Sequence, residues 1–178
     1  MKRISIVFTL LLAVTIPLSL TGCGSESKTT NDSIEIYQVI IRNVYLNDNS
    51  FGKPVDIKYL YILKDTDDGI GDSEITQQPS QKITDEVMDG ISSKLSDLPP
   101  KITWINSYDE VLNKNVSLTV EDGAIVTLGN IGYENDTKAY VSIGIYFSGL
   151  AGLGRTYILE KDKETWKIIG DTGGGWVS

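Results

Sequence analysis

Apolar residues in the first part of the chain recur with the spacing of α-helices. They lie three or four positions apart over residues 33–46 and again from Thr84 to Leu98, and this spacing predicts two amphipathic helices. Thr84 suits the N-cap position, and the acidic residues after it suit the positive end of the helix dipole. Two shorter stretches rich in β-branched and aromatic residues predict strands. These stretches are residues 57–63 and 101–105.

Beyond residue 120 the apolar residues alternate with polar or small ones, which is the spacing of half-buried strands. The strands expected in this part are 124–128, 139–147, 155–160 and 165–169. Three successive hairpins predict an antiparallel meander. The predicted fold class is therefore α+β, with an antiparallel meander sheet of about four to six strands and two main helices packed on one face.

The first residues have the layout of an export signal. Lys2 and Arg3 precede an uncharged apolar run over residues 4–20 that is short for a membrane span. The motif Leu20-Thr21-Gly22-Cys23 then resembles the lipobox of bacterial lipoproteins. The resemblance implies that Cys23 receives a diacylglyceryl group and that the signal peptide, residues 1–22, is removed just before it. An uncleaved N-terminal helix with an incidental cysteine is the alternative.

This resemblance also implies a location and a division of the chain. Two acyl chains hold a protein firmly on a bilayer, so we expect it at the cell membrane, lipid-anchored, on the extracytoplasmic face. After the lipidated cysteine, residues 23–33 are small and polar and predict a flexible tether. Residues 34–178 are long enough for one globular domain and short for two.

Composition removes several classes of activity. The 178 residues include no histidine and one cysteine, which excludes a Ser-His-Asp triad, a Cys-His pair, an intrachain disulfide and a histidine- or cysteine-based zinc site. The formal net charge is −8, and loss of Lys2 and Arg3 with the signal makes the exported part more acidic still. Contact with phosphates needs clustered lysine and arginine, so nucleic acid is not an expected partner.

An acidic loop expected over residues 64–80 is a candidate cation site. Asp65, Asp67, Asp68 and Asp72 lie close together in the sequence, and hard cations such as calcium bind several carboxylate oxygens on a turning loop. The spacing does not fit an EF-hand, because the glycine falls one position early. A solvated acidic loop is the alternative to a calcium site. The same carboxylates are the candidates for acid/base hydrolysis.

A second candidate site lies on one face of the strand expected at 139–147. Tyr140 and Tyr146 share the face opposite the apolar row, with small and hydroxyl residues between them. Aromatic shelves of this kind bind sugars, peptides or other proteins, and a helix-packed second core face is the alternative. Arg155 follows a glycine-rich stretch and is a candidate clamp for an anionic ligand, with a structural ion pair as its alternative.

Two stretches resemble known motifs without fitting them. Residues 149–156 resemble a phosphate-binding loop, but arginine replaces its lysine and a strand follows instead of a helix, so no nucleotide is expected. We interpret the stretch as a glycine-bearing hairpin loop. Asp171-Thr172-Gly173 resembles the triplet of aspartic proteases, which needs a second copy that this chain lacks. We interpret it as a flexible turn that lets Trp176 fold back.

The layout of helices followed by a meander that ends in the strand TWKIIGD is loosely similar to the cone-shaped domains of the nuclear-transport-factor-like superfamily. This resemblance concerns arrangement and implies no activity. The leading hypothesis is a membrane-anchored lipoprotein that binds a small ligand or an envelope protein without catalysis, so no catalytic residue is assigned. The alternatives are a calcium-binding or carboxylate-dependent hydrolase of the cell envelope, and a structural envelope protein with no discrete ligand.

Overall fold

The computed structural model describes residues 25–47, 56–72, 74, 77–113, 118–148 and 151–178, so the predicted signal peptide and Cys23 lie outside the described residues. Its helices are α1 (Ser25–Asn47) and α2 (Asp85–Lys94), with two 3-10 turns, η1 (Asp68–Ile70) and η2 (Tyr108–Glu110). Its strands are β1 (Tyr59–Leu63), β2 (Lys101–Ile105), β3 (Leu112–Asn113), β4 (Thr119–Val120), β5 (Gly123–Asn135), β6 (Lys138–Ser148), β7 (Ala151–Asp162) and β8 (Thr165–Val177). The fold is α+β, as the spacing of apolar residues predicts.

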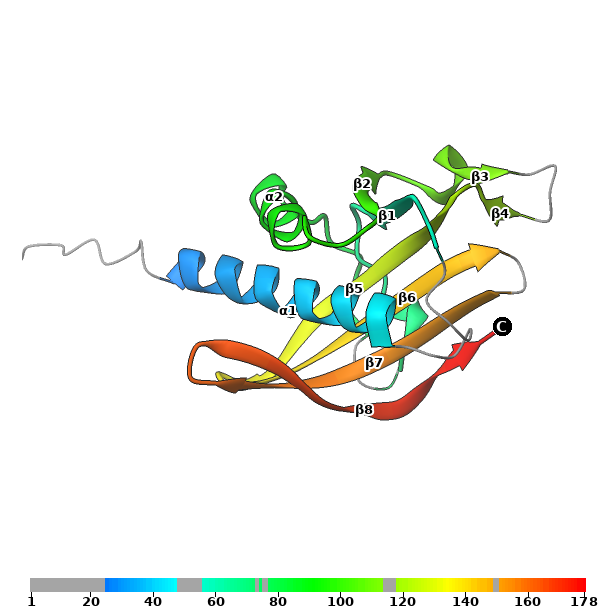
Figure 1. The fold of residues 1–178 in the computed structure, drawn as a ribbon. Coiled ribbons are helices and arrows are strands. Elements are labelled where there is room, and N and C mark those ends of the chain that lie inside the picture. The colour runs from blue at the N-terminus through cyan, green and yellow to red at the C-terminus, as the bar shows by residue number, and fades with distance from the viewer. Residues whose placement is uncertain (1–24, 48–55, 73, 75–76, 114–117, 149–150) are drawn as a thin grey trace, which may run out of the picture.

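The six-stranded sheet is mixed and has the order β2-β1-β5-β6-β7-β8 (Figure 1). Strands β5 to β8 form the expected antiparallel meander, whereas β1 is parallel to both β2 and β5. The prediction of a purely antiparallel sheet is therefore wrong for β1 and β2. The reason is the connection: the chain leaves β1, passes through α2 and returns as β2, and a helical crossover of this kind joins parallel strands.

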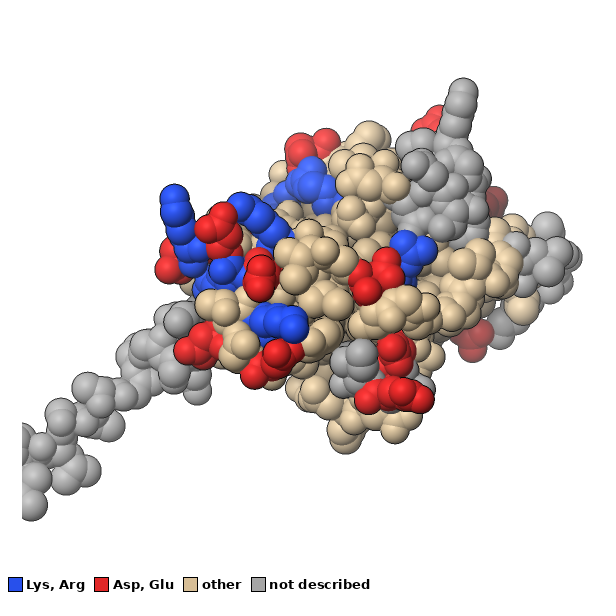
Figure 2. All heavy atoms as spheres, turned by 90° about the horizontal axis from the view of Figure 1, so that it is seen from below, with Lys and Arg blue, Asp and Glu red and all other residues tan. Residues whose placement is uncertain are grey.

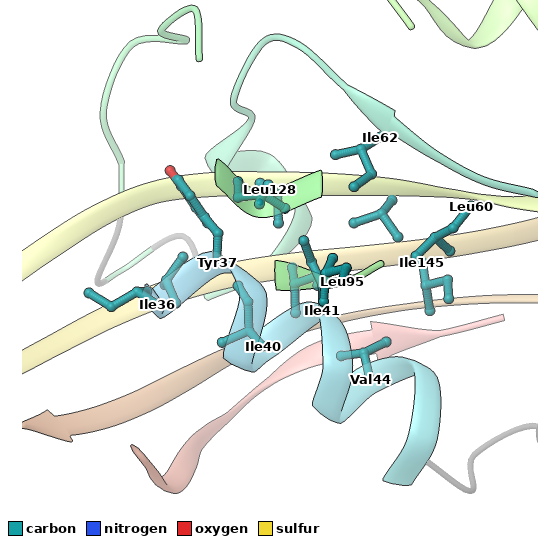
Figure 3. Packing of buried hydrophobic residues seen from close by; sticks show 14 of the residues in the cluster. Ile36, Tyr37, Ile40, Ile41, Val44, Leu60, Ile62, Leu95, Leu128 and Ile145 are labelled. Atoms are coloured by element: carbon teal, nitrogen blue, oxygen red, sulfur yellow. The ribbon is translucent and has the colours of Figure 1, made fainter. Parts of the chain in front are cut away.

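Both helices lie over the same face of the sheet (Figure 1), where they cover one continuous apolar core. Ile36, Ile40 and Ile41 of α1 are at most 1% exposed. Figure 3 shows these side chains in one apolar cluster with residues of β1, β5 and β6. The strand residues that face α1 and α2 in this core include Leu60, Ile62, Val126, Leu128, Val141, Ile143 and Ile145.

Helix α1 is longer than the sequence predicts, and this corrects the expected tether. It begins at Ser25, so residues 25–33 are helical. The Asp32 carboxylate lies 2.6 Å from Lys161 Nζ, and only 14% and 6% of these side chains are exposed. This hydrogen bond raises the pKa of the Lys161 ammonium above its ordinary value. Residues 25–33 are polar and have no apolar stripe, so the sequence does not predict a helix there. The contact that holds this part of α1 comes from Lys161, which is distant in the sequence.

Helix α2 begins as predicted. The Thr84 hydroxyl accepts a hydrogen bond from the Val87 amide, and the apolar side chains of this helix are buried against α1 and the sheet. After its last turn, Asp97 pairs with the Arg42 guanidinium of α1 through two hydrogen bonds of 2.9 and 2.7 Å. This bidentate pair fixes the two helices to each other at the solvent side.

The end of β8 fastens η1 onto the sheet. The Trp176 indole donates to the Ile70 carbonyl over 3.1 Å and lies against Gly152 and Gly154 of β7. Of the stretch expected to be a hairpin loop, residues 149–150 lie outside the described residues, and strand β7 runs from Ala151 onward. The indole leaves room for glycine only at Gly152 and Gly154. The turn expected before Trp176 is also part of a strand, with a register shift where Gly173 and Gly175 have φ values of +75° and +150°.

We predict that Gly154→Ala lowers the free energy of unfolding by about 2 kcal/mol or more, as overpacked sites do. A Cβ at this position would lie 1.9 Å from the Ile70 carbonyl oxygen and 2.3 Å from Trp176 Nε1. Gly170→Ala on β8 is the matched control, because its Cβ would meet nothing within 4 Å. Urea denaturation of both variants measures the difference, and equal effects would contradict the proposed fastening.

Candidate functional site

A cleft of about 750 Å³ lies beyond the carboxyl ends of β1 and β2. Because these strands are parallel and adjacent, the segments that follow them meet at one edge of the sheet. The segment after β1 contributes the acidic stretch, and the segment after β2 contributes Asn106, Ser107 and Tyr108. The other residues that line the cleft are Leu63, Asp65, Thr66, Asp67, Asp68, Gly69, Gln77, Gln78 and Ser80.

Asp68 is the buried centre of the loop that forms this cleft. Only 5% of the surface of Asp68 is exposed to solvent. One carboxylate oxygen accepts from the Asn130 amide at 2.7 Å, and the other accepts from the Gln78 amide at 2.8 Å and from Asn130 Nδ2 at 3.0 Å. A buried carboxylate with three N–H donors is a structural anchor, since its negative charge is satisfied by the protein itself.

A β-bulge in β5 places the two N–H donors of Asn130 next to Asp68. Gly129 and Asn130 stand opposite a single residue of β6, so the ladder is interrupted between Leu128 and Ile131. The carbonyl of Gly129 accepts from the Tyr37 hydroxyl of α1 at 3.0 Å, while the Asn130 amide donates to Asp68 on the loop. Burial raises the pKa of the Tyr37 hydroxyl well above its ordinary value, and Tyr133 and Asp68 raise it further.

The segment 77–81 crosses over this anchor and closes one side of the cleft. Besides the Gln78 bond to Asp68, the Gln81 amide donates to Thr66 Oγ1 at 2.8 Å, and Asn130 Nδ2 lies 3.2 Å from the Pro79 carbonyl. Thr66 and Gln78 also line a second cavity of about 210 Å³ that opens toward Tyr37. The cleft and this smaller cavity therefore share Thr66 and Gln78 in their linings.

The four predicted cation ligands do not converge. Asp65, Asp67 and Asp68 line the cleft, but Asp68 is bound by amides, and one oxygen of Asp67 accepts from the Gly69 amide at 2.8 Å as the cap of η1. Asp72 lies beside Gly174 of β8 instead. In the part of the chain that the structure describes, no three residues among Asp, Glu, Cys and His form a group suited to a metal ion.

The predicted tyrosine shelf is covered in its middle. Ser142, between Tyr140 and Tyr146 on β6, is fully buried, and Gly144 has Ile70 of η1 above it. Between the two tyrosines this face is therefore packed, which is close to the alternative of a second core face, although a loop and not a helix covers it. The acidic loop after β1 lies on that face, which the spacing within β6 alone does not reveal.

Each predicted tyrosine instead has its own partners. The Tyr140 hydroxyl donates to Glu134, which also pairs with Lys138 at 2.9 Å. Figure 2 shows acidic and basic side chains interspersed at the end of the domain that carries the β5–β6 and β7–β8 turns, where such pairs lie. The Tyr146 hydroxyl donates to the Leu118 carbonyl at 3.0 Å, and its ring meets Tyr108 edge-on.

Arg155 lies in a different depression from the acidic loop's cleft. This depression has a volume of about 260 Å³ and is formed with Asp171, residues 173–175 and Trp176. One guanidinium nitrogen of Arg155 lies 3.8 Å from the Asp171 carboxylate. This contact is the structural ion pair that was the alternative for Arg155.

The cleft itself is acidic and polar. Asp65 and Asp67 are exposed, Asp68 is buried, the other polar side chains of the lining are amides and hydroxyls, and none of the lining residues is basic. On its floor the Tyr108 hydroxyl lies 2.6 Å from Thr127 Oγ1. Burial raises the pKa of Tyr108, the hydrogen bond with Thr127 opposes that shift, and the Asp67 carboxylate adds to it. Two carboxylates beside an aromatic ring favour a cationic group.

Sequence reasoning missed Tyr108, Asn106 and the amides that hold Asp68. Their role depends on the parallel pairing of β1 with β2, which local spacing does not encode. One signal was present: Gly129 directly follows the strand predicted at 124–128, and a glycine beside an apolar run is typical of a bulge or a close approach. A Cβ at Gly129 would lie 2.8 Å from the Asp68 carboxylate, which explains the glycine.

Comparison of the chain with models of protein families, with curated proteins and with solved structures finds no match. Neither described helix is long and apolar enough to cross a bilayer.

We predict that Asp68→Asn lowers the free energy of unfolding by about 2–4 kcal/mol, because an amide group cannot accept all three N–H groups and adds donors of its own. Asp65→Asn changes charge in the same way at an exposed position, and its effect should stay within about 0.5 kcal/mol. Urea denaturation measures both. Faster amide exchange at Gln78 and Asn130 in Asp68→Asn alone would locate the effect, and a neutral Asp68→Asn would contradict the anchor.

Proposed function

We propose that this protein is a lipid-anchored binding module of the extracytoplasmic membrane surface, and that its cleft beyond β1 and β2 takes up a cationic group of a ligand. The observation that carries the second part is the acidic lining around Tyr108, with no basic residue among the lining side chains. The lipobox Leu20-Thr21-Gly22-Cys23 supports the first part.

Charge and shape support a cationic ligand over other small molecules. A carboxylate pair at the rim of a cleft attracts an ammonium or guanidinium group and repels phosphates and carboxylates. The Tyr108 ring offers a face for the same group, and the amide side chains of Gln77 and Asn106 add neutral hydrogen-bonding groups. The acidity of the whole chain draws cations toward it from solution.

The side chains of the cleft favour binding of a ligand over catalysis. General acid/base hydrolysis by carboxylates needs a pair of them placed on either side of the scissile bond. Asp68, the most buried carboxylate of the cleft, is bound by three protein N–H groups. Asp65 and Asp67 remain, and Asp67 also caps η1. This arrangement suits recognition of charge better than transfer of a proton.

The anchor is tested by the variant Cys23→Ser. We expect it to leave the membrane fraction of the host bacterium, because the acyl chains can no longer be attached. Mass spectrometry of the unaltered protein should find a diacylglyceryl group on Cys23 and no residue before it. Ser25→Ala is the control and should stay in the membrane fraction. An unmodified, full-length chain recovered from the cytosol would contradict the anchor.

The cleft is tested with n-butylammonium and with n-butanol, its neutral counterpart of similar shape. In an NMR titration of the full chain in zwitterionic micelles, we expect butylammonium to shift the amides of Asp67, Gly69 and Tyr108, and butanol to leave them in place. Asp67→Asn should weaken binding about fivefold or more, since a charge-assisted contact is lost. Added salt should weaken binding in the unaltered protein.

Asp136→Asn provides the matched control for charge, because Asp136 is an exposed acid at the β5–β6 turn. It should bind butylammonium as the unaltered protein does. Equal binding of butanol and butylammonium would contradict the proposed cleft chemistry. A rise in melting temperature with calcium that Asp67→Asn abolishes would replace it with the calcium-site alternative.

A further inference from the structure

Strand β2 is an edge of the sheet, and half of its backbone groups face outward. The Lys101 amide donates to the Lys58 carbonyl, and the Lys64 amide donates to the Ile105 carbonyl, so residues 101, 103 and 105 bond toward β1. The backbone N–H and C=O groups of Ile102 and Trp104 therefore point away from the sheet. No strand or side chain among the described residues pairs with them.

The side chains of β2 leave this edge open. Ile102 and Trp104 pack against the main core, and Trp104 Nε1 donates to the Ser92 hydroxyl of α2 at 2.9 Å. Lys101 at the start is the only charged residue of the strand, and its pairing with β1 runs without a bulge. Edge strands are usually protected by charges, prolines or bulges. Here the protection lies at the start, where Pro99 and Pro100 precede Lys101, so the remaining edge is suited to accept another strand.

The open edge leads directly into the acidic cleft. The next outward amide, that of Asn106, donates to Glu110 at 2.9 Å, so the free edge ends there. Asn106, Ser107 and Tyr108 then line the cleft opposite Asp65 and Asp67. A strand advances about 3.3 Å per residue, so an extended chain beside Ile102 and Trp104 brings its following side chain over the cleft.

We propose that the open edge of β2 and the acidic cleft together bind an extended polypeptide segment that carries a lysine or arginine. The segment adds a strand beside β2 through the backbone groups of Ile102 and Trp104, and its cationic side chain enters the cleft near Asp67. The inference rests on the proposed function, since it names the kind of ligand that the acidic cleft takes. The acidic cleft is complementary in charge to a basic side chain, and the open edge of β2 can hydrogen-bond an extended backbone.

The test uses a capped peptide of alternating valine and threonine with one central lysine, bound to the full chain in zwitterionic micelles. A second peptide replaces the lysine by norleucine, and a third carries N-methyl groups on the amides that would face β2. We expect the parent peptide to bind more tightly than butylammonium and to protect the Ile102 and Trp104 amides from exchange. Both altered peptides should bind about tenfold more weakly, through loss of charge or of backbone hydrogen bonds.

The variant Ile102→Pro removes one outward N–H group and leaves the hydrogen bonds to β1 in place, because residue 102 does not bond toward β1. Proline is tolerated at such edge positions. It should weaken the parent peptide about tenfold and leave butylammonium binding unchanged, with Ile102→Val as control. The N-methylated peptide keeps the test valid should Ile102→Pro fail to fold, since it needs no change in the protein.

Several results would overturn the inference. Equal binding of the N-methylated and parent peptides would show that no strand is added at β2. If butylammonium binds but the peptide binds no more tightly, the inference about β2 is wrong and the proposed function stands. If neither butylammonium nor the peptide binds, both the inference and the proposed function are wrong. Concentration-dependent self-association that protects the Ile102 and Trp104 amides would make a second copy of this chain the occupant of the edge.

Discussion

The buried carboxylate of Asp68 is the interaction on which the rest of the site depends. A negative charge taken out of water is costly unless hydrogen bonds replace its hydration, and here three N–H groups do so. Two of them come from the bulge residue Asn130 and one from segment 77–81. The same carboxylate therefore joins the loop after β1, the middle of β5 and the segment before α2, and the cleft is the space left at their meeting point.

Two places where the backbone is closely approached also hold the loop after β1 in position. The bulge exposes the Gly129 carbonyl to Tyr37 of α1 and the Asn130 amide to the loop, so one irregularity in β5 is bound from both faces of the sheet. On the far side of the loop, Gly154 allows Trp176 and the Ile70 carbonyl to meet. Hydrogen bonds across long sequence separations thus hold the loop, including one from the Asp72 amide to the Thr156 hydroxyl, so the cleft depends on the whole fold.

This distribution of contacts explains what could be predicted from the sequence. The meander of β5 to β8 and helix α2 were predictable, because alternation, helical spacing and the Thr84 cap are local properties. The parallel pairing of β1 and β2 was not, because either strand alone has the same pattern in both kinds of sheet. Asp65, Asp67 and Asp68 were recognised as candidates, but the carboxylate that is buried is decided by Asn130, 62 positions away. The start of α1 escaped detection for the same reason, since Lys161 lies 129 positions from Asp32.

The early start of α1 has a consequence for any molecule that approaches the domain. Only Gly24 separates Cys23 from the first residue of this helix. If Cys23 carries acyl chains, the domain sits directly on its anchor and has almost no lateral reach. Strands β1 and β2 run parallel to β5, whose last residues lie beside Ser33 in the first half of α1. A ligand of the cleft would then be taken up close to the membrane surface, within the short reach that the anchor allows.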